Sequence, residues 1–302
     1  MNRREFLQSG AGALALTALT PSMLGAEETP PAPAAPKRPI HKGIMWATVG
    51  VKGSVLEKMK AIKEAGFEGT EMMSHMDQDE VLRARDAAGL TIPSVCGRDH
   101  WAKPLSHPDP KVRAEGLESL KQTLRDAKRY GASSVLLVPG VVNQEIAYND
   151  AYQRSQAEIR KALPLAEELG VKIACENVWN NFLLSPLEAA RYVDEFNSPA
   201  IGWHFDVGNV INYGWPEQWI RILGPRIQKF HIKEFSRTKR DSQGLWKGFD
   251  VRLMEGDDNW PAVMKAVDEI GYRGWVMTEQ PGGDTPEGLK DLADRLTRIL
   301  AL

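Results

Sequence analysis

Residues 172–206 of this 302-residue chain read KIACENVWNNFLLSPLEAARYVDEFNSPAIGWHFD, and this stretch decides the fold. A short apolar run at Lys172–Asn177 contains a glutamate near its end, and an amphipathic segment follows at Pro186–Glu195. A second apolar run at Ile201–Asp206 ends in an aspartate. Short apolar runs separated by a helical segment are typical of a βα unit in a parallel sheet. The stretch therefore predicts a strand, a helix and a second strand.

The same pattern repeats along the chain from about residue 40. The predicted strands span Gly43–Thr48, Gly69–Met73, Ile92–Cys96, Ser134–Val138, Lys172–Asn177, Ile201–Asp206, Lys229–Lys233 and Trp275–Glu279. The predicted helices span Val55–Ala65, Asp79–Ala88, Pro110–Tyr130, Ala151–Leu169, Pro186–Glu195, Trp215–Leu223, Pro261–Ile270 and Pro286–Ile299. Several of them end at a glycine, the expected helix stop, namely Gly66, Gly131, Gly170 and Gly271.

Eight strand–helix repeats predict an α/β fold of the (β/α)8 TIM-barrel type, whose active site lies at the carboxyl ends of the strands. A doubly wound sheet is the alternative, but no GxGxxG turn follows the first predicted strand. The hydrophobic content of 42% allows a sizeable core and excludes a disordered or fibrous chain. With 38 Lys+Arg against 40 Asp+Glu, the formal charge of −2 disfavours nucleic acid and anionic membranes as partners.

The N-terminus carries the features of an export leader. Arg3 and Arg4 precede an uncharged stretch rich in Gly, Ala, Leu and Thr, and adjacent arginines followed by Phe-Leu resemble a twin-arginine signal. The predicted organisation is a signal peptide at 1–26, a Pro/Ala-rich linker at 27–39 and the barrel at 40–302. The mature protein is then expected to be periplasmic or otherwise extracytoplasmic. An uncleaved membrane anchor is the alternative, although Pro21 and the modest apolar length disfavour it.

The last four predicted strands each carry a metal-capable side chain at the carboxyl end: Glu176, Asp206, His231 and Glu279. Neighbouring strand ends in a barrel can converge on one point above it. Each residue alone has an ordinary explanation as a helix cap, a core histidine or a solvated loop residue. Two glutamates, one aspartate and one histidine at matching positions instead predict a site for one divalent cation, Mn²⁺, Mg²⁺ or Co²⁺, with Zn²⁺ as an alternative.

Other polar and aromatic residues are weaker candidates for contacts with a ligand. Lys233 shares the face of His231, because residues two apart on a strand point the same way. Glu71, at the end of the second strand, could contact substrate hydroxyls, whereas His204 is expected to be a core or supporting histidine. Three aromatic residues at strand ends or in loops could form a wall against a sugar ring, namely Trp46, Trp101 and Trp179, although core packing is the expected role of any one of them taken alone.

The motifs around the four predicted ligands carry a resemblance to a known family. Glu176 in Ala-Cys-Glu-Asn, Asp206 in Asp-Val-Gly-Asn, His231 in Phe-His-Ile-Lys and Glu279 in Thr-Glu-Gln resemble the metal ligands of the xylose isomerase-like TIM-barrel family. The similarity runs from about Ile44 to the C-terminus. This family includes sugar and sugar-phosphate isomerases, 3-epimerases and a branch of apurinic endonucleases. The resemblance implies the fold and a metal-dependent activity.

The resemblance extends to positions that contact substrate. Arg237 matches a substrate-binding arginine of the ketose 3-epimerases, and His100 with Trp101 resembles a loop of the pentulose-phosphate branch. Asn209 stands where simple ketose epimerases carry a histidine, as in the phosphate-sugar branch. Phe182 replaces a substrate-contacting glutamate of the epimerases, which implies a different or bulkier ligand.

The predicted function is that of a divalent-metal-dependent isomerase or epimerase acting on a small carbohydrate, a ketose or sugar phosphate. Glu176 and Glu279 are expected on opposite sides of the barrel mouth, where one removes a proton and the other returns one through an enediolate. Lys233 and Arg237 would hold a carboxylate, a phosphate or a developing oxyanion. The alternatives are a lyase or hydrolase of oxidised (3-keto) glycosides and a non-catalytic sugar-binding protein.

The sequence also bears on whether the chain is an endonuclease and on its oligomeric state. The endonuclease branch uses extra histidines for a three-zinc cluster, whereas this chain has six histidines, of which His41 is assigned to the linker and His107 to a loop. An endonuclease is therefore disfavoured. No residue pattern decides between a monomer and a homo-oligomer.

Overall fold

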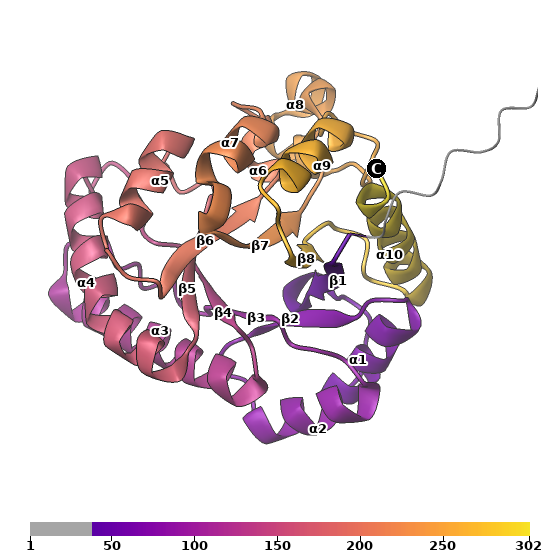
Figure 1. The fold of residues 1–302 in the computed structure, drawn as a ribbon, viewed down its shortest axis with the longest axis horizontal. Helices are drawn as coiled ribbons and strands as arrows, with labels where there is room; N and C mark the ends of the chain where they lie inside the picture. Colours follow the sequence, from indigo (N-terminus) through magenta and orange to yellow (C-terminus); the bar gives the residue numbers. More distant parts are fainter. Residues whose placement is uncertain (1–37) are drawn as a thin grey trace, which may run out of the picture. The chain divides into compact units, whose positions relative to one another are not determined.

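The computed structural model describes residues 38–302, so the predicted leader and nearly all of the predicted linker lie outside the described residues. Eight parallel strands close into a barrel in sequence order, with β1 hydrogen-bonded to both β2 and β8 (Figure 1). The strands are β1 (Ile40–Met45), β2 (Gly69–Met73), β3 (Ser94–Cys96), β4 (Ser134–Leu137), β5 (Lys172–Glu176), β6 (Ile201–Asp206), β7 (Ile227–Ile232) and β8 (Gly274–Thr278). The predicted TIM barrel is confirmed.

Helices alternate with the strands and surround the barrel (Figure 1). They are α1 (Val55–Glu64), α2 (Gln78–Ala88), α3 (Pro110–Tyr130), α4 (Tyr148–Leu169), α5 (Pro186–Asp194), α6 (Gly208–Ile211), α7 (Pro216–Leu223), α8 (Arg237–Gln243), α9 (Trp260–Glu269) and α10 (Pro286–Leu300). Three 3-10 turns complete the set, η2 (Trp46–Thr48), η3 (Gly224–Arg226) and η4 (Leu245–Phe249). Among residues 38–302, none of the helices has the length and apolar character needed to cross a membrane.

Side chains at the helix ends explain where the helices begin and stop. Ser54 and Glu57 form a capping box, in which each side chain accepts from the backbone N–H of the other. Ser185 caps α5 in the same position, with a proline as the first helical residue. Gly131 and Gly170 end α3 and α4 with φ of 78° and 65°, a left-handed conformation that favours glycine. These capping residues and terminal glycines therefore agree with the helix positions expected of a (β/α)8 barrel.

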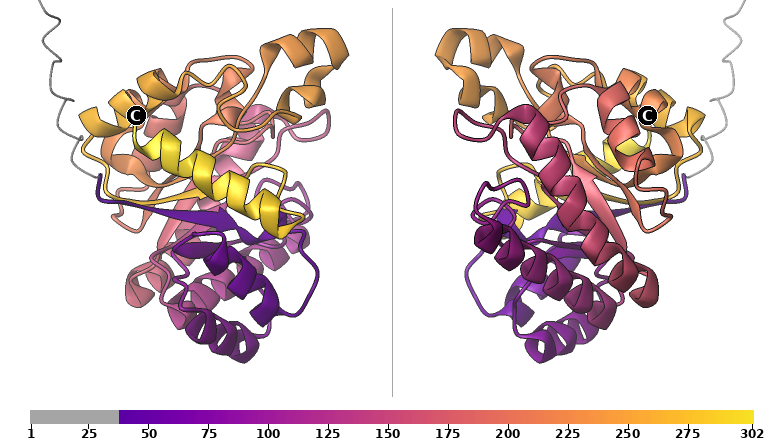
Figure 2. Two further views of the ribbon diagram at one scale, coloured as in Figure 1. Left: turned by 90° about the vertical axis from the view of Figure 1, so that its right-hand side faces the viewer. Right: turned by 90° about the vertical axis from the view of Figure 1, so that its left-hand side faces the viewer.

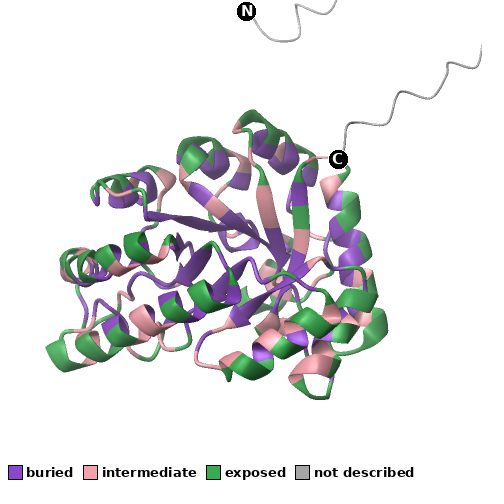
Figure 3. Cartoon of the chain, turned by 60° about the horizontal axis from the view of Figure 1, so that its bottom comes forward, coloured by how far each residue is buried: buried purple, intermediate pink, exposed green. Residues whose placement is uncertain are grey.

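Most strand residues are buried, and the helices carry both buried and exposed residues (Figure 3). All six residues of β6 are buried, including His204 and Asp206, which are both 0% exposed. Burial on both faces is expected of a parallel sheet that helices cover on one side and that closes around its own interior. Charged groups at the strand ends therefore lie in a region from which water is largely removed.

The first strand differs from its prediction. It begins at Ile40 rather than Gly43, and the predicted final residues, Trp46–Thr48, form the 3-10 turn η2. His41, assigned above to the linker, lies within β1, so that assignment is wrong. Its ring stacks on that of Trp275 in β8, with the centroids 4.9 Å apart. The polar residues His41 and Lys42 interrupt the apolar run, which is why the run alone placed the start too late.

The connection between β7 and α9, residues 233–259, contains two elements that the sequence did not predict, α8 and η4. In Figure 2 this segment, in orange, projects from the barrel at its rim. The α8 sequence, RTKRDSQ, has no buried residue and no apolar stripe, so it gives no helical periodicity. A Ser236 cap that accepts from the Lys239 N–H begins this helix. We call residues 233–259 the β7–α9 loop.

Candidate metal centre

The four predicted metal ligands converge at the carboxyl ends of β5 to β8. One ligand atom each from Glu176, Asp206, His231 and Glu279 lies within 4.8 Å of the others. The strand register produces this convergence, because Asp206 is paired with His231 and Glu279 follows β8 directly. The first three side chains are at most 6% exposed, and that of Glu279 is 22% exposed. The prediction that these residues lie together is borne out by the geometry.

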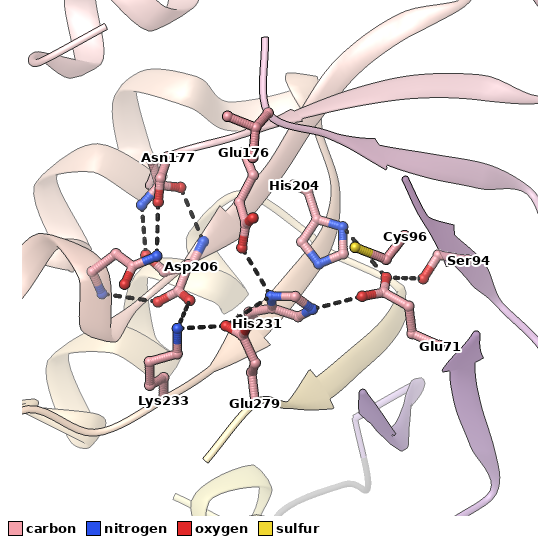
Figure 4. Close-up of polar contacts among 12 residues, drawn as sticks. Glu71, Ser94, Cys96, Glu176, Asn177, His204, Asp206, His231, Lys233 and Glu279 are labelled. Carbon is pink, nitrogen blue, oxygen red and sulfur yellow. Dashed lines mark hydrogen bonds and ion pairs between the residues drawn. The ribbon is translucent and has the colours of Figure 1, made fainter. Parts of the chain in front are cut away.

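His231 is the centre of this group (Figure 4). Its Nδ1 lies 2.9 Å from Glu176 Oε1 and 3.4 Å from Glu279 Oε2, and its Nε2 lies 2.9 Å from Glu71 Oε1. Burial alone would lower the pKa of His231, but the surrounding carboxylates of Glu71, Glu279 and Glu176 outweigh burial and raise it well above its usual value. The imidazole thus lies between two sets of carboxylates, one on each ring nitrogen.

Lys233 brings a second positive charge into the group. Its Nζ lies 2.5 Å from Glu279 Oε2 and 3.1 Å from Asp206 Oδ2. Burial would raise the pKa of Glu279, but Lys233 and His231 outweigh it and hold that pKa well below its usual value. Glu279 is therefore ionised at neutral pH.

The remaining carboxylates show that the group fits a divalent cation. Burial raises the pKa of Glu176 to about 7 and that of Asp206 to about 6, although His231 and Lys233 respectively oppose these shifts. The nearby positive charges of His231 and Lys233 thus do not fully offset the burial of these two carboxylates. A set of three carboxylates and one imidazole suits a divalent ion with a preference for oxygen ligands.

Two asparagines hold Asp206 in place. Asn177 Nδ2 donates to the Asp206 carbonyl at 2.7 Å, and the Asp206 N–H donates to Asn177 Oδ1 at 3.0 Å. The Asn209 N–H donates to Asp206 Oδ1 at 2.8 Å, and its side chain donates to the Asn177 carbonyl at 3.0 Å. Asn209, predicted to bind substrate, borders the cavity but holds a metal-ligand candidate in place. Asn177 was not predicted as a site residue, although it directly follows Glu176.

A cavity of about 470 Å³ opens above the four ligands. It is lined by Met45, Cys96, His100, Trp101, Leu136, Glu176, Val178, Trp179, Asn209, Lys233, Trp246, Phe249, Glu279 and Pro281. The predicted contacts His100, Trp101, Asn209 and Lys233 are therefore brought together with both glutamates. A cavity of this size with few polar groups is typical of a small-molecule site.

Glu71 does not reach this cavity, contrary to its predicted contact with substrate hydroxyls. It is 0% exposed and lies within β2, two residues before the strand ends at Met73. Its carboxylate accepts from the Ser94 hydroxyl and contacts His231 Nε2. Glu71 therefore supports His231 from below. His204 is fully buried beside it, with its ring 4.2 Å from that of His231, as expected of a supporting histidine.

Arg237 and Phe182 also lie away from the described cavity lining. The Arg237 guanidinium donates to the carbonyls of Ile211 at 3.0 Å and Gly214 at 3.2 Å, because α8 begins at this residue and directs it toward the loop after β6. Phe182 is 2% exposed and packs edge-on in a cluster with Tyr148, Tyr152 and Tyr192. Phe182 is therefore part of the surrounding core and not of the cavity lining.

The two glutamates are closer together than predicted. β5 and β8 are three strands apart rather than diametrically opposed, and both carboxylates approach the same nitrogen, Nδ1 of His231. Both glutamates nevertheless line the cavity, so a ligand in it contacts both.

Two of the three tryptophans considered for an aromatic wall line the cavity. Trp101 and Trp179 line the cavity, whereas Trp46 is outside its lining and lies under the Lys58 ammonium, 5.6 Å from the ring centroid. Trp246 and Phe249 were missed, because they belong to η4 in the unpredicted β7–α9 loop. Their aromatic character was visible in the sequence, but their position was not.

Comparison with known proteins gives one family and a group of sugar epimerases. The sequence profile of the xylose isomerase-like TIM barrel family matches residues 59–299. L-ribulose-5-phosphate 3-epimerase UlaE from Escherichia coli O1:K1 is 26% identical over 238 residues, which cover 74% of this chain and 81% of that protein.

Solved structures share the fold at lower identity. The 3-keto-D-glucoside 4-epimerase YcjR from E. coli superimposes with a TM-score of 0.71 at 17% identity, covering 87% of this chain and 99% of that one. An IolI protein with a bound zinc atom superimposes with a TM-score of 0.69 at 18% identity, covering 86% and 98% of the two chains.

Proposed function

The chain belongs to the xylose isomerase-like TIM barrel family, and on that premise we propose that it is a divalent-metal-dependent carbohydrate epimerase or isomerase. One observation carries the proposal: Glu176 and Glu279 both line the cavity while they share a four-residue ligand set with Asp206 and His231. The sequence relative UlaE, an epimerase of a ketose phosphate by name, supports the same reaction class.

The environments of the two glutamates suit them to exchange a proton with a substrate. A divalent cation held by the four ligands would polarise a substrate carbonyl and acidify the adjacent C–H. Glu279, held ionised by Lys233 and His231, can accept that proton. Glu176, which also lines the cavity, is the second carboxylate that can exchange a proton with the substrate. The Lys233 ammonium can donate to the negative oxygen that develops.

Solvent exchange tests the proposal directly. Protein loaded with Mn²⁺ is incubated in D₂O with free ketoses, ketose phosphates and 3-keto-glycosides, and each sugar is followed by NMR. Deuterium should appear on the carbon next to the carbonyl of at least one sugar, together with its epimer or isomer. A sugar that binds without any exchange would instead identify a non-catalytic binding protein.

A second candidate is a lyase acting on oxidised glycosides. The aromatic residues around the cavity favour it, because they could receive an aglycone or second sugar. The same proton abstraction next to a ketone would then break the C–O bond at the β carbon, and the substituent would leave as an alcohol. Release of the free alcohol from a 3-keto-glycoside, with formation of an unsaturated ketone, separates this reaction from epimerisation.

We also propose that residues 1–26 export the protein by the twin-arginine route. The proposal rests on Arg3 and Arg4 ahead of an uncharged apolar stretch. Replacing both arginines with lysine should leave the precursor in the cytoplasm, which cell fractionation and immunoblotting can measure. Unchanged periplasmic delivery of the double variant would contradict this route.

A further inference from the structure

Three aromatic side chains at the cavity mouth, Trp179, Trp246 and Phe249, form a continuous surface that we call the aromatic rim. The Trp179 ring lies 4.8 Å from that of Trp246 and 4.9 Å from that of Phe249, with tilts of 47° and 46°. Phe235 supports Trp179 from behind, edge-on at 5.8 Å. The Trp179 indole N–H donates to the Asn209 carbonyl at 2.9 Å, which fixes the orientation of that ring.

Trp246 is both a cavity residue and strongly exposed. It lines the cavity above the metal centre, yet 69% of its surface is open to solvent. A single exposed apolar residue needs no explanation, but an exposed tryptophan that continues the wall of a concave site marks a surface that a ligand can cover. The proposed epimerase or isomerase reaction by itself gives this surface no role.

The charges around the cavity do not suit a phosphate. Among its described lining residues, Lys233 is the one side chain that is positively charged at neutral pH, and it already pairs with Asp206 and Glu279. His100 is uncharged there, because burial lowers its pKa to about 4. Phosphate recognition normally uses unpaired arginine or lysine donors.

Two arginines of the β7–α9 loop, Arg237 and Arg252, also lie outside the cavity lining. Arg237 is bound to the backbone carbonyls of Ile211 and Gly214. Arg252 borders a different hollow, which it shares with the carboxylates of Glu287 and Asp291. Apart from Lys233, which is already paired, the described lining residues offer a phosphate no positively charged side chain.

We propose that the substrate is an uncharged glycoside, whose reacting sugar lies at the metal centre while its attached sugar or aglycone stacks on Trp246. The inference rests on the proposed function for the reacting end and on the aromatic rim for the other. The apolar face of a pyranose or an aromatic aglycone can pack on an indole, and its hydroxyls remain in water at the open mouth. The chain thus differs in ligand from a relative named for a ketose phosphate.

Binding measurements on the full chain loaded with Mn²⁺ test the subsite without depending on turnover. The probes are D-fructose, D-ribulose 5-phosphate, cellobiose and 4-nitrophenyl β-D-glucoside, each titrated by calorimetry and tryptophan fluorescence. Cellobiose and the nitrophenyl glucoside should bind more tightly than the two ketoses. Trp246→Ala should weaken both glycosides by about tenfold and leave D-fructose unchanged.

Trp215→Ala is the matched control, because Trp215 is 56% exposed and lies outside the cavity lining. It should leave the affinity for all four probes unchanged. Equal effects of Trp246→Ala and Trp215→Ala, tighter binding of the phosphate than of the glycosides, or no binding of either glycoside would each overturn the inference.

The outcomes also separate this inference from the proposed function. Deuterium exchange on a ketose without glycoside binding would overturn the subsite and leave the epimerase in place. Glycoside binding that depends on Trp246, without proton exchange on any sugar, would retain the subsite and overturn the epimerase.

Discussion

The floor of the cavity, formed by the residues at the strand ends, differs from its aromatic rim in both side-chain chemistry and the elements that position it. The floor consists of charged side chains at the ends of β5 to β8, buried and linked through His231 (Figure 4). The rim consists of aromatic side chains, two of them on η4 in the β7–α9 loop that projects from the barrel (Figure 2). Strand register places each floor residue, whereas a single loop places most of the rim. Under the two proposals above, the barrel would carry the chemistry and the loop would select the ligand.

Glu279→Gln should cause the largest change, a loss of turnover. The substitution should affect proton transfer at the floor and not ligand binding at the rim. Glutamine keeps a neutral oxygen for the metal but cannot accept a proton, so turnover should fall by roughly 10²- to 10⁴-fold. Binding of glycosides to the rim should change little. Steady-state rates and solvent-exchange rates measure the first effect, with metal content determined on the same sample. Glu287→Gln on the exposed first turn of α10 is the control. A metal-loaded variant with wild-type exchange rates would contradict the two-glutamate mechanism.

His231→Ala should weaken metal binding by at least about 100-fold, more than loss of an outer partner of a ligand usually costs. The variant loses the imidazole and leaves the Glu71 and Glu176 carboxylates without their shared partner. Calorimetric titration with Mn²⁺ measures the change, and His41→Ala at the far end of β1 should behave as wild type.

The wild-type metal content is the reference for that experiment. It should be about one ion per chain after reconstitution with Mn²⁺, Co²⁺ or Zn²⁺. No stoichiometric metal would contradict the metal centre. Three ions per chain would instead indicate the cluster of the endonuclease branch.

Glu71→Gln should reduce the affinity for Mn²⁺ less than His231→Ala does, because Glu71 acts on the metal only through His231. Loss of the carboxylate at Nε2 removes the group that orients the ring, so Mn²⁺ affinity should fall by about 10- to 100-fold. The ¹⁵N chemical shifts of His231 should also change in the metal-free protein, since the partner of Nε2 is altered. Glu64→Gln, at the exposed end of α1, supplies the comparison. Unchanged affinity together with unchanged shifts would show that Glu71 does not position His231.

Acidification should gradually weaken the binding of a divalent cation at the floor and leave glycoside binding at the rim unaffected. In the metal-free protein the pKa of Glu176 is about 7 and that of Asp206 about 6, and the pKa of His231 is raised. A cation must displace the protons that these groups hold at lower pH, so affinity falls as pH decreases. The expected loss is about tenfold per pH unit for each displaced proton below pH 7.

Titrations with Mn²⁺ at pH 6, 7 and 8 measure this dependence, and calorimetry in buffers of different ionisation enthalpy counts the released protons. Glycoside affinity at the rim should stay constant over the same range, since the pKa of His100 is about 4. A Mn²⁺ affinity independent of pH would contradict the assigned ligands.

The floor could be predicted from the sequence because two local rules determine it. An apolar run marks a strand, and a polar side chain at its carboxyl end lies at the barrel mouth. Glu71 did not follow the second rule, because it lies two residues before β2 ends at Met73, beside His231. The predicted strand also ended at Met73, so its bounds already placed Glu71 short of the strand end, whereas the contact with His231 depends on the tertiary structure.

The rim could not be predicted, because its positions depend on tertiary contacts. Buried Glu234 accepts from the Met254 and Asp258 N–H groups and from the Trp260 indole, which ties the two ends of the β7–α9 loop together. No periodicity in residues 237–249 indicates this anchoring. The position of Arg237 outside the cavity lining was not predicted for the same reason, since a helix that its own sequence does not predict directs the side chain toward Ile211.

The pairing of β1 with β8 has a consequence for how the chain folds. Residues 40–44 bond to residues 274–278, so the barrel cannot close until nearly the whole polypeptide has left the ribosome. Contacts between such distant segments form late and slowly, because a long loop must be ordered first. The earlier βα units can collapse while the chain is still growing, but their open sheet edges remain unpaired. Closure by the last strand is therefore the step in biogenesis during which the polypeptide is most exposed to misassociation.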